Sequence, residues 1–152
     1  MAEAKFEKLN RTEAPMYGPR KMLLCGFPVA GQSKFKSVLE KCGLAGIYLV
    51  WPSEDQKSLK LSELFALPDD TGRGIASSLP RAVIAAGITQ NELHALMTAC
   101  RKSGMQQALW AVLTPTSETW TLHALLTELQ AEREALQRRQ SRKKSSSPGD
   151  PD

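Results

Sequence analysis

The sequence predicts a small three-layer α/β domain, in which a four-stranded, mainly parallel sheet is built from two βαβ half-repeats and followed by a C-terminal helix. Four short runs are apolar at consecutive positions, which is typical of strands covered on both faces. Segments with apolar residues at helical spacing separate them. About 30 residues connect the second run to the third, which suits a crossover and not a hairpin. The runs are Met22 to Cys25, Ile47 to Trp51, Ala82 to Ala86 and Ala108 to Leu113.

The sequence is also compatible with one alternative fold. A ferredoxin-like α+β sheet has the element order βαββαβ, and this chain would adopt it with an insertion and with the C-terminal helix over the open face. Both folds place a helix after the first and third strands. The long second connection favours the mainly parallel sheet.

The first half-repeat covers about residues 21–52. It begins with the strand-like stretch KMLLCGF and ends with a second one, GIYLVWP. Between them, residues 30–42 carry four apolar residues at the i, i+3, i+4, i+7 spacing of one helical face, namely Phe35, Val38, Leu39 and Cys42. A short helical piece at residues 58–67 and a polar loop then lead to the second half.

The second half-repeat covers about residues 81–115 and contains the strand-like stretches AVIAAGI and ALWAVLT. Thr89 and Glu92 have the spacing of a capping box and predict a helix start between these strands. A final helix is expected over about residues 117–139, with a leucine stripe at Leu122, Leu125, Leu126, Leu129 and Leu136.

A shift of 61 residues superimposes the two halves without gaps and indicates an internal repeat. Gly26 falls on Gly87, where each strand turns into its helix. Gly43 falls on Gly104, where each helix ends and a left-handed residue is needed.

The ends of the chain differ in composition from this domain of residues 21–137. Residues 1–20 form a polar arm that we expect to be flexible, with Pro15, Gly18 and Pro19 at its end. Residues 138–152 form a basic tail rich in Ser, Pro and Gly, for which we expect disorder. The net charge is +4, and without the tail 15 basic and 14 acidic groups remain. Weak, non-specific contact with polyanions would therefore be confined to the tail.

Several functions are disfavoured by the motifs. The stretch LLCGFPVAGQSKF resembles a phosphate-binding loop, but Gln32 stands where the lysine would be and no strand ends in a magnesium-binding Asp, so no nucleoside triphosphate is expected. His94 and His123 lack partners at metal-ligand spacing, and no nucleophile motif occurs. We therefore expect no catalytic residue, no metal and no cofactor.

The cysteines and the hydropathy pattern indicate the cellular compartment of the protein. No run approaches the roughly 20 apolar residues of a membrane helix, and the N-terminus has no signal-peptide pattern. The three cysteines, Cys25, Cys42 and Cys100, lie in apolar patterns and indicate free thiols of a reducing compartment. We expect a cytoplasmic protein without membrane contact.

A parallel sheet would bring all strand ends to one edge, where such folds bind ligands. Hydroxyls and helix-start amides would gather there and suit an anion or a polar peptide end. The alternative is that these residues only cap helices, with Thr116 or Ser117 capping the last one. Trp120, expected on the first turn of that helix, would either anchor the turn or offer a binding platform. The candidates are Gly26, Gly87, Thr89, Thr114, Thr116, Ser117 and Trp120.

The stretch LTPTSETWTLHALLTELQAERE, preceded by RAVIAAGITQNELHALMTACRKSG, resembles an uncharacterised bacterial family, domain of unknown function 3783, over roughly residues 80–135. The resemblance implies a bacterial cytoplasmic protein and carries no activity with it. The residues that carry it are Thr114, Pro115, Thr116, Trp120, Leu125, Leu126, Leu129 and Glu132.

Together these observations predict a non-enzymatic cytoplasmic binding or adaptor module that acts through contacts with a protein partner. The alternative is a sensor of a small anion or polar metabolite, or an enzyme, that uses the strand-end crevice. A charged residue converging on that crevice would favour the alternative.

Overall fold

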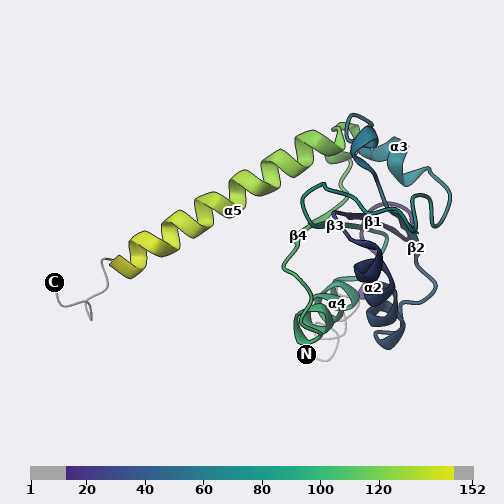
Figure 1. The fold of residues 1–152 in the computed structure, drawn as a ribbon, viewed down its shortest axis with the longest axis horizontal. Helices are drawn as coiled ribbons and strands as arrows, with labels where there is room; N and C mark the ends of the chain where they lie inside the picture. Colours follow the sequence, from purple (N-terminus) through teal and green to yellow (C-terminus); the bar gives the residue numbers. More distant parts are fainter. Residues whose placement is uncertain (1–12, 146–152) are drawn as a thin grey trace, which may run out of the picture.

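Four strands form one sheet in the order β2-β1-β3-β4 in the computed structural model, which describes residues 13–145 (Figure 1). The strands are β1 (Lys21–Cys25), β2 (Tyr48–Val50), β3 (Ala82–Ala86) and β4 (Leu109–Val112). The helices are α2 (Val29–Lys41), α3 (Leu61–Phe65), α4 (Gln90–Lys102) and α5 (Leu122–Ser145), with 3-10 turns η1 (Glu54–Gln56) and η2 (Ser117–Thr119). The chain therefore has an α/β fold.

The sheet is mixed. β1 pairs with β2 and β3 pairs with β4 in parallel, whereas the two central strands, β1 and β3, are antiparallel. The expectation of a mainly parallel sheet is thus roughly right, since the pairs within each βαβ unit are parallel and only the central pair, where the units join, is antiparallel. In each unit the two strands are direct neighbours, which differs from the split βαβ of the ferredoxin-like alternative.

The side chains of the strands alternate between two apolar clusters, which explains why the strands are apolar at consecutive positions. Met22 and Leu24 of β1 belong to one cluster, which also contains residues of α2 and α4. Leu23 and Cys25 belong to the other cluster, which contains residues of α3 and α5.

Residues 13–20 lie against the turn between β3 and α4. The amide of Met16 donates to the carbonyl of Ile88 at 2.8 Å, and the amide of Gly87 donates to the carbonyl of Tyr17 at 3.2 Å. The side-chain oxygens of Glu118 accept a hydrogen bond from the Tyr17 hydroxyl at 2.9 Å. These contacts hold residues 13–20 on the domain, in contrast to the flexible arm expected from the prolines and glycine; residues 1–12 lie outside the described part.

The final helix begins later than its leucine pattern predicts. Residues 117–119 form η2, Trp120 is extended, and α5 starts at Leu122, so the expectation of Trp120 on its first helical turn is wrong. The amide of Leu61 donates to the carbonyl of Trp120 at 2.9 Å, and a bridge joins Lys60 to Thr121. This pairing with the start of α3 keeps the chain extended.

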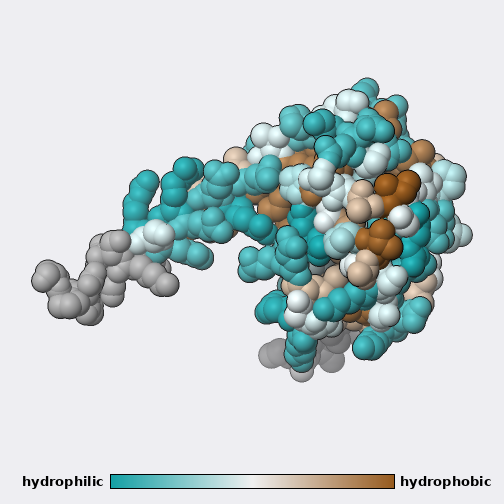
Figure 2. Space-filling view, in the orientation of Figure 1, coloured by the Kyte–Doolittle hydropathy of each residue, from teal (hydrophilic) through white to brown (hydrophobic). Residues whose placement is uncertain are grey.

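The same helix also continues further than expected. α5 reaches Ser145, so residues 138–145 are helical and not an irregular tail; residues 146–152 fall outside the described part. Figure 1 shows α5 leaving the domain and projecting away from it, and Figure 2 shows that the projecting part is hydrophilic. Within residues 13–145, no helix combines the length and apolar character needed to cross a membrane.

Candidate ligand pocket beside the C-terminal helix

The predicted strand-end residues are divided between two opposite edges of the sheet. Because β1 and β3 are antiparallel, the end of β1 lies beside the beginning of β3, with Cys25 opposite Ala82. Gly26 therefore lies at one edge, while Gly87 lies at the other. The remaining candidates, Thr89, Thr114, Thr116, Ser117 and Trp120, follow β3 or β4 and share the edge of Gly87. One crevice that contains all seven is not formed.

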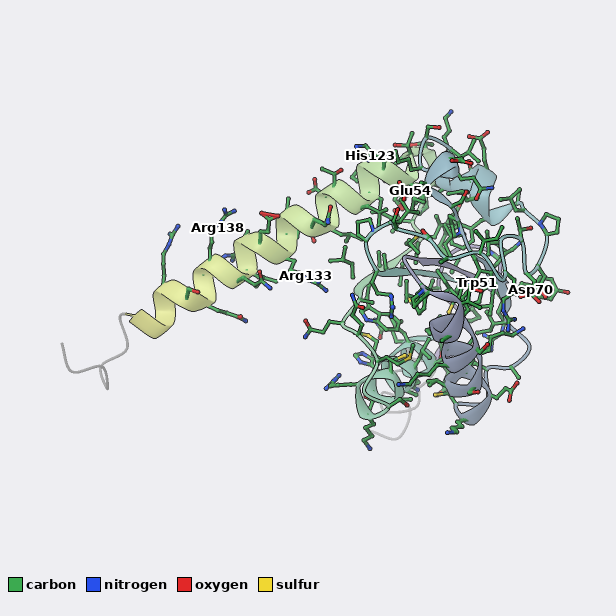
Figure 3. All side chains as sticks on the ribbon, viewed as in Figure 1. Trp51, Glu54, Asp70, His123, Arg133 and Arg138 are labelled. Carbon is green, nitrogen blue, oxygen red and sulfur yellow. The ribbon has the colours of Figure 1, made fainter. Side chains whose placement is uncertain are left out.

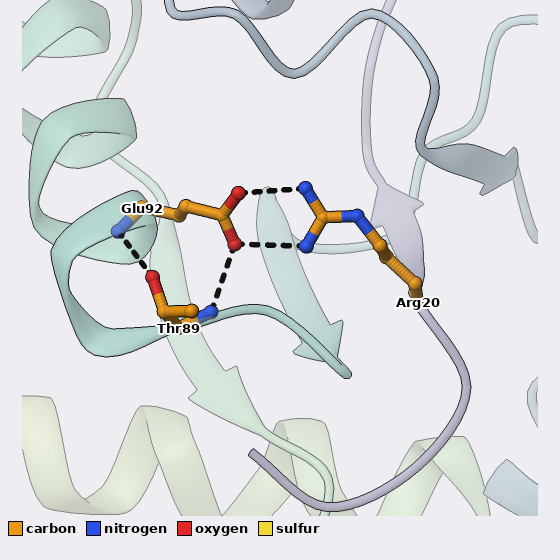
Figure 4. Close-up of polar contacts among 3 residues, drawn as sticks. All are labelled: Arg20, Thr89 and Glu92. Carbon is orange, nitrogen blue, oxygen red and sulfur yellow. Dashed lines mark hydrogen bonds and ion pairs between the residues drawn. The ribbon is translucent and has the colours of Figure 1, made fainter. Parts of the chain in front are cut away.

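Thr89 and Glu92 form the predicted capping box at the start of α4 (Figure 4). The amide of Glu92 donates to the Thr89 hydroxyl at 3.0 Å, and the amide of Thr89 donates to the Glu92 carboxylate at 2.9 Å. The two terminal guanidinium nitrogens of Arg20, Nη1 and Nη2, also donate to this carboxylate, at 2.8 and 2.6 Å. The hydrogen bond from Arg20 lowers the pKa of Glu92 to about 2, while burial opposes this shift.

The hydroxyls that follow β4 are also engaged locally. The Ser117 amide donates to the Thr114 hydroxyl at 2.9 Å, and the Thr114 amide donates to the Ser117 hydroxyl at 3.0 Å. The carbonyl of Thr116 accepts a hydrogen bond from the Thr119 side chain. α5 is capped by Thr121, whose hydroxyl accepts from the amide of Ala124 at 3.1 Å, and not by Thr116 or Ser117. These contacts support a capping and turn-forming role, and a binding role for the same residues stays a prediction.

Gln32, which stands at the lysine position of the phosphate-loop resemblance, holds a loop in place. Its side chain is 1% exposed. The amide nitrogen donates to the carbonyl of Ile75 at 2.9 Å, and the amide oxygen accepts from the amide of Gly74 at 2.8 Å. The side chain is thus occupied by the backbone of residues 74–75 and is not directed at a phosphate.

A cavity of about 400 Å³ lies at the edge where β3 and β4 begin, between α4 and α5. Its volume is in the range of small-molecule sites, roughly 300–1,000 Å³. We call it the α5 pocket. Most of its apolar wall comes from the sheet, α4 and the loop before β4. The apolar side chains that line it include Phe27, Val83, Met97, Met105, Trp110 and Leu136.

Three arginines line the α5 pocket: Arg81 before β3, Arg101 in the last turn of α4, and Arg133 on α5. Among the residues that the structure describes, none of the three has a carboxylate within salt-bridge distance, and no Asp or Glu lines the cavity. Within the described residues, the lining of this pocket therefore carries positive charge and no carboxylate.

Two of these arginines are fixed by backbone carbonyls. Nε of Arg81 donates to the carbonyl of Gly26 at 3.1 Å, and its guanidinium lies 4.1 Å from the centre of the Phe27 ring. Burial lowers the pKa of Arg81 from its ordinary value, yet the group stays charged at neutral pH. Nη2 of Arg133 donates to the carbonyl of Ala108 at 2.9 Å, and Figure 3 shows Arg133 extending from α5 towards the domain.

Cys100 also lines the α5 pocket, but it does not supply a nucleophile. Burial raises the pKa of the Cys100 thiol to about 11, so the thiol is protonated near neutral pH. A buried, protonated thiol behaves as a small apolar group. Within the described residues no group of three or more His, Cys, Asp or Glu side chains could hold a metal ion. The pocket lining thus offers arginine donors and apolar contacts.

The sequence alone does not point to this pocket, because its arginines lie 20 and 32 residues apart and form no motif. One signal was present. Arg133 lies four residues after Leu129 and three before Leu136, on the apolar stripe of α5. Of the predicted residues only Gly26 adjoins the pocket, through its bond to Arg81.

The fold and this pocket define a mixed α/β domain of two βαβ units with an arginine-lined cavity beside its last helix. The model of one family, a domain of unknown function (DUF3783), matches residues 81–136, which confirms the resemblance seen over residues 80–135. No curated protein and no solved structure matches the chain. The matched segment runs from β3 into α5 and contains all three pocket arginines.

Proposed function

We propose that this protein is a non-enzymatic binding module that acts through protein contacts, and that the distal half of α5, residues 134–145, is its contact surface. The observation that carries the proposal is that α5 projects away from the domain (Figure 1), and that none of its described residues after Gln137 lines the α5 pocket. All described side chains from Leu136 to Arg142 are exposed. The N-terminal half is held by Leu122, Leu125 and Leu126, which are buried.

An isolated helix has little stability of its own, because most helical stability in proteins comes from packing. α5 has 24 residues and is therefore about 36 Å long, at about 1.5 Å per residue. Its distal half has no apolar stripe that could pack on the domain, since Leu136 is followed only by polar residues. A partner that lies along this half would stabilise it, and so the segment suits a contact surface.

The charge of the distal half indicates what kind of partner fits. Its side chains include Arg138, Arg139 and Arg142, with Glu134 as the one acidic residue of the segment. Glu134 and Arg138 are four residues apart, which supports the helix slightly. An acidic protein surface would complement this segment. Other polyanions would also be attracted, weakly and in a salt-dependent manner.

Site-specific photo-crosslinking in native cell extract tests the proposal. A photoreactive amino acid in place of exposed Arg139 should crosslink to one discrete protein. The same amino acid in place of Ser62, which is exposed on α3, should not. Reversing the charge in the double variant Arg138→Glu, Arg142→Glu should abolish the crosslink at position 139. Equal crosslinking at both positions, or a crosslink that survives charge reversal, would contradict the proposal.

The second candidate function is a sensor of a small anion, and the α5 pocket is the observation that favours it. The strand-end crevice supports it less, because Gly26 lies at the opposite edge of the sheet from the other six candidates and the hydroxyls of Thr89, Thr114 and Ser117 are engaged in local hydrogen bonds. In this case the ligand would lie between the sheet and Arg133 of α5.

We also infer the bacterial cytoplasm as the setting, a three-layer arrangement of helices on both sheet faces, and descent of the two units from one repeat. Free Cys25, Cys42 and Cys100 support a reducing compartment. The two apolar clusters support the layers. Positive φ at Gly26 and Gly87, 76° and 68°, supports the repeat.

A further inference from the structure

We propose that the α5 pocket is a binding site for a small amphiphilic monocarboxylate, with the carboxylate between the arginines and an aromatic or aliphatic body on the apolar wall. This inference does not rest on the proposed partner surface at residues 134–145. Leu136 belongs to both, but the three arginines that carry the inference lie outside that segment. Three features of the pocket carry it: the uncompensated charge, the fixed donors and the apolar wall.

The charge comes from three separate elements that converge on one cavity. Arg81, Arg101 and Arg133 are far apart in the sequence, and each lines the pocket without a carboxylate partner in the described residues. Bringing like charges together in a partly desolvated site costs free energy unless an anion compensates them. A bound carboxylate would supply that compensation.

The donors are held in place before any ligand arrives. A guanidinium has five N–H donors, and Arg81 and Arg133 each use one on a backbone carbonyl, of Gly26 and of Ala108. The remaining donors can form the bidentate pair that arginine makes with a carboxylate. Anchored side chains lose less rotational freedom on binding, which favours affinity.

The wall beneath these donors is apolar. Val83 of β3 is the register partner of Trp110 on β4, and both line the cavity together with Met97 and Met105. Leu136, which is 52% exposed, closes the side formed by α5. Contact between this wall and a hydrocarbon group would remove apolar surface from water and so favour binding, whereas a purely polar ion would make no such contact.

The position of the pocket argues against a phosphate. Phosphate sites use the amides at helix N-termini, where the helix dipole favours negative charge. Here the neighbouring end of α4 is its C-terminus, because Cys100 and Arg101 lie in the last turn. That end carries partial negative charge and disfavours a multiply charged anion. A singly charged carboxylate with an apolar body fits both the charge and the wall.

Calorimetric titration of the full-length protein tests the inference. The probes are 1-naphthoate and decanoate, the matched neutral alcohols 1-naphthalenemethanol and decanol, and inorganic phosphate. We expect at least one carboxylate to bind at least tenfold more tightly than its alcohol and than phosphate. Failure of both carboxylates to bind at millimolar concentration would overturn the inference, and so would equal affinity for carboxylate and alcohol, or tighter binding of phosphate.

Variants then locate the binding. Arg101→Gln should weaken carboxylate binding at least tenfold, because it removes one charge from the pocket. Arg138→Gln, a matched change on the exposed face of α5 outside this cavity, should leave the affinity unchanged. Leu136→Asp places a negative charge at the mouth of the pocket and should weaken binding without removing a buried side chain. Unchanged affinity in both Arg101→Gln and Leu136→Asp would place the ligand elsewhere and overturn the inference.

Discussion

Arg133 stands where the leucine pattern of α5 would place another apolar residue. Its side chain is half-buried and donates to the carbonyl of Ala108. Where α5 leaves the domain, a hydrogen bond from an arginine therefore replaces the apolar contact that a leucine would make. One residue thus ends the packed part of the helix and supplies a donor to the α5 pocket. A polar residue on the apolar stripe of a helix breaks the pattern that the fold requires there, and such exceptions concentrate at functional sites.

Glu92 yields a prediction about pH. Its pKa in the folded protein, about 2, lies below its ordinary value of 4.5, mainly because Arg20 donates to the carboxylate. The resulting stability is therefore present above about pH 5 and is lost as the pH falls towards 2. Glu92→Gln keeps a side chain suited to the capping box but loses the ion pair. Because both side chains are partly exposed, we expect a loss of only about 1 kcal/mol at pH 7.

Urea denaturation of the wild type and of Glu92→Gln at several pH values measures this difference in the free energy of unfolding. The free energies of unfolding should differ at pH 7, and the difference should shrink as the pH falls from about 5 towards 2. A constant difference across that range would show that the ion pair between Arg20 and Glu92 contributes no pH-dependent stability.

Trp120 yields a prediction about packing. It is 37% exposed, and the bond that ties this position to α3 is made by its backbone carbonyl. We therefore expect Trp120→Ala to lower the free energy of unfolding by about 1–2 kcal/mol, less than the roughly 3–5 kcal/mol of a fully buried tryptophan. Trp120→Phe should have a smaller effect. Thermal unfolding measures both. An alanine variant that melts like the wild type but loses its partner would make Trp120 a binding residue.

At the scale of elements, α5 combines two roles along its length. Its first turns carry buried leucines and complete one face of the sheet, whereas its distal half is exposed (Figure 2). The composition of residues 138–152 suggested an irregular tail, and yet the helix continues to Ser145. Arg and Gln have high helix propensity, so a basic polar segment can prolong a helix that has already started.

Deletion of residues 138–152 should change the melting temperature by no more than about 2 °C. The described side chains of residues 138–142 are exposed and none is apolar, so little stabilising contact is lost. A longer deletion that begins at residue 129 removes Leu129 and Arg133 and should lower the melting temperature clearly. Differential scanning calorimetry compares the melting temperatures of the full-length protein and the two truncated proteins. Equal melting of the two truncated proteins would contradict the assignment of packing to the first half of α5.

At the scale of the whole molecule, the relative direction of the two βαβ units decides which residues meet. With β1 and β3 antiparallel, Gly26 lies beside Arg81 and far from Gly87, although both glycines occupy equivalent places in their units. The edge that would have gathered all strand ends does not exist. Instead, the beginnings of β3 and β4 adjoin the end of β1, and the α5 pocket lies there.

The sequence by itself determined the local structure. The apolar runs predicted the positions of all four strands, and the Thr89 capping box placed the start of α4 at Gln90. Gly26 and Gly87 both adopt the positive φ that their turns require. These features depend on residues close together in the chain, whose periodicity and backbone preferences are visible without the fold.

Only the tertiary structure decided the join between the two units, the start of α5 and the α5 pocket. Each βαβ unit is internally parallel whichever way its partner points, so the pattern within a unit says nothing about the central pair. The start of α5 depends on hydrogen bonds with residues about 60 positions away, because the Leu61 amide donates to the carbonyl of Trp120 and the Leu122 amide donates to the carbonyl of Leu59. The three pocket arginines share no spacing rule, because they meet through packing of distant segments, and the free energy of such contacts is not encoded in local periodicity.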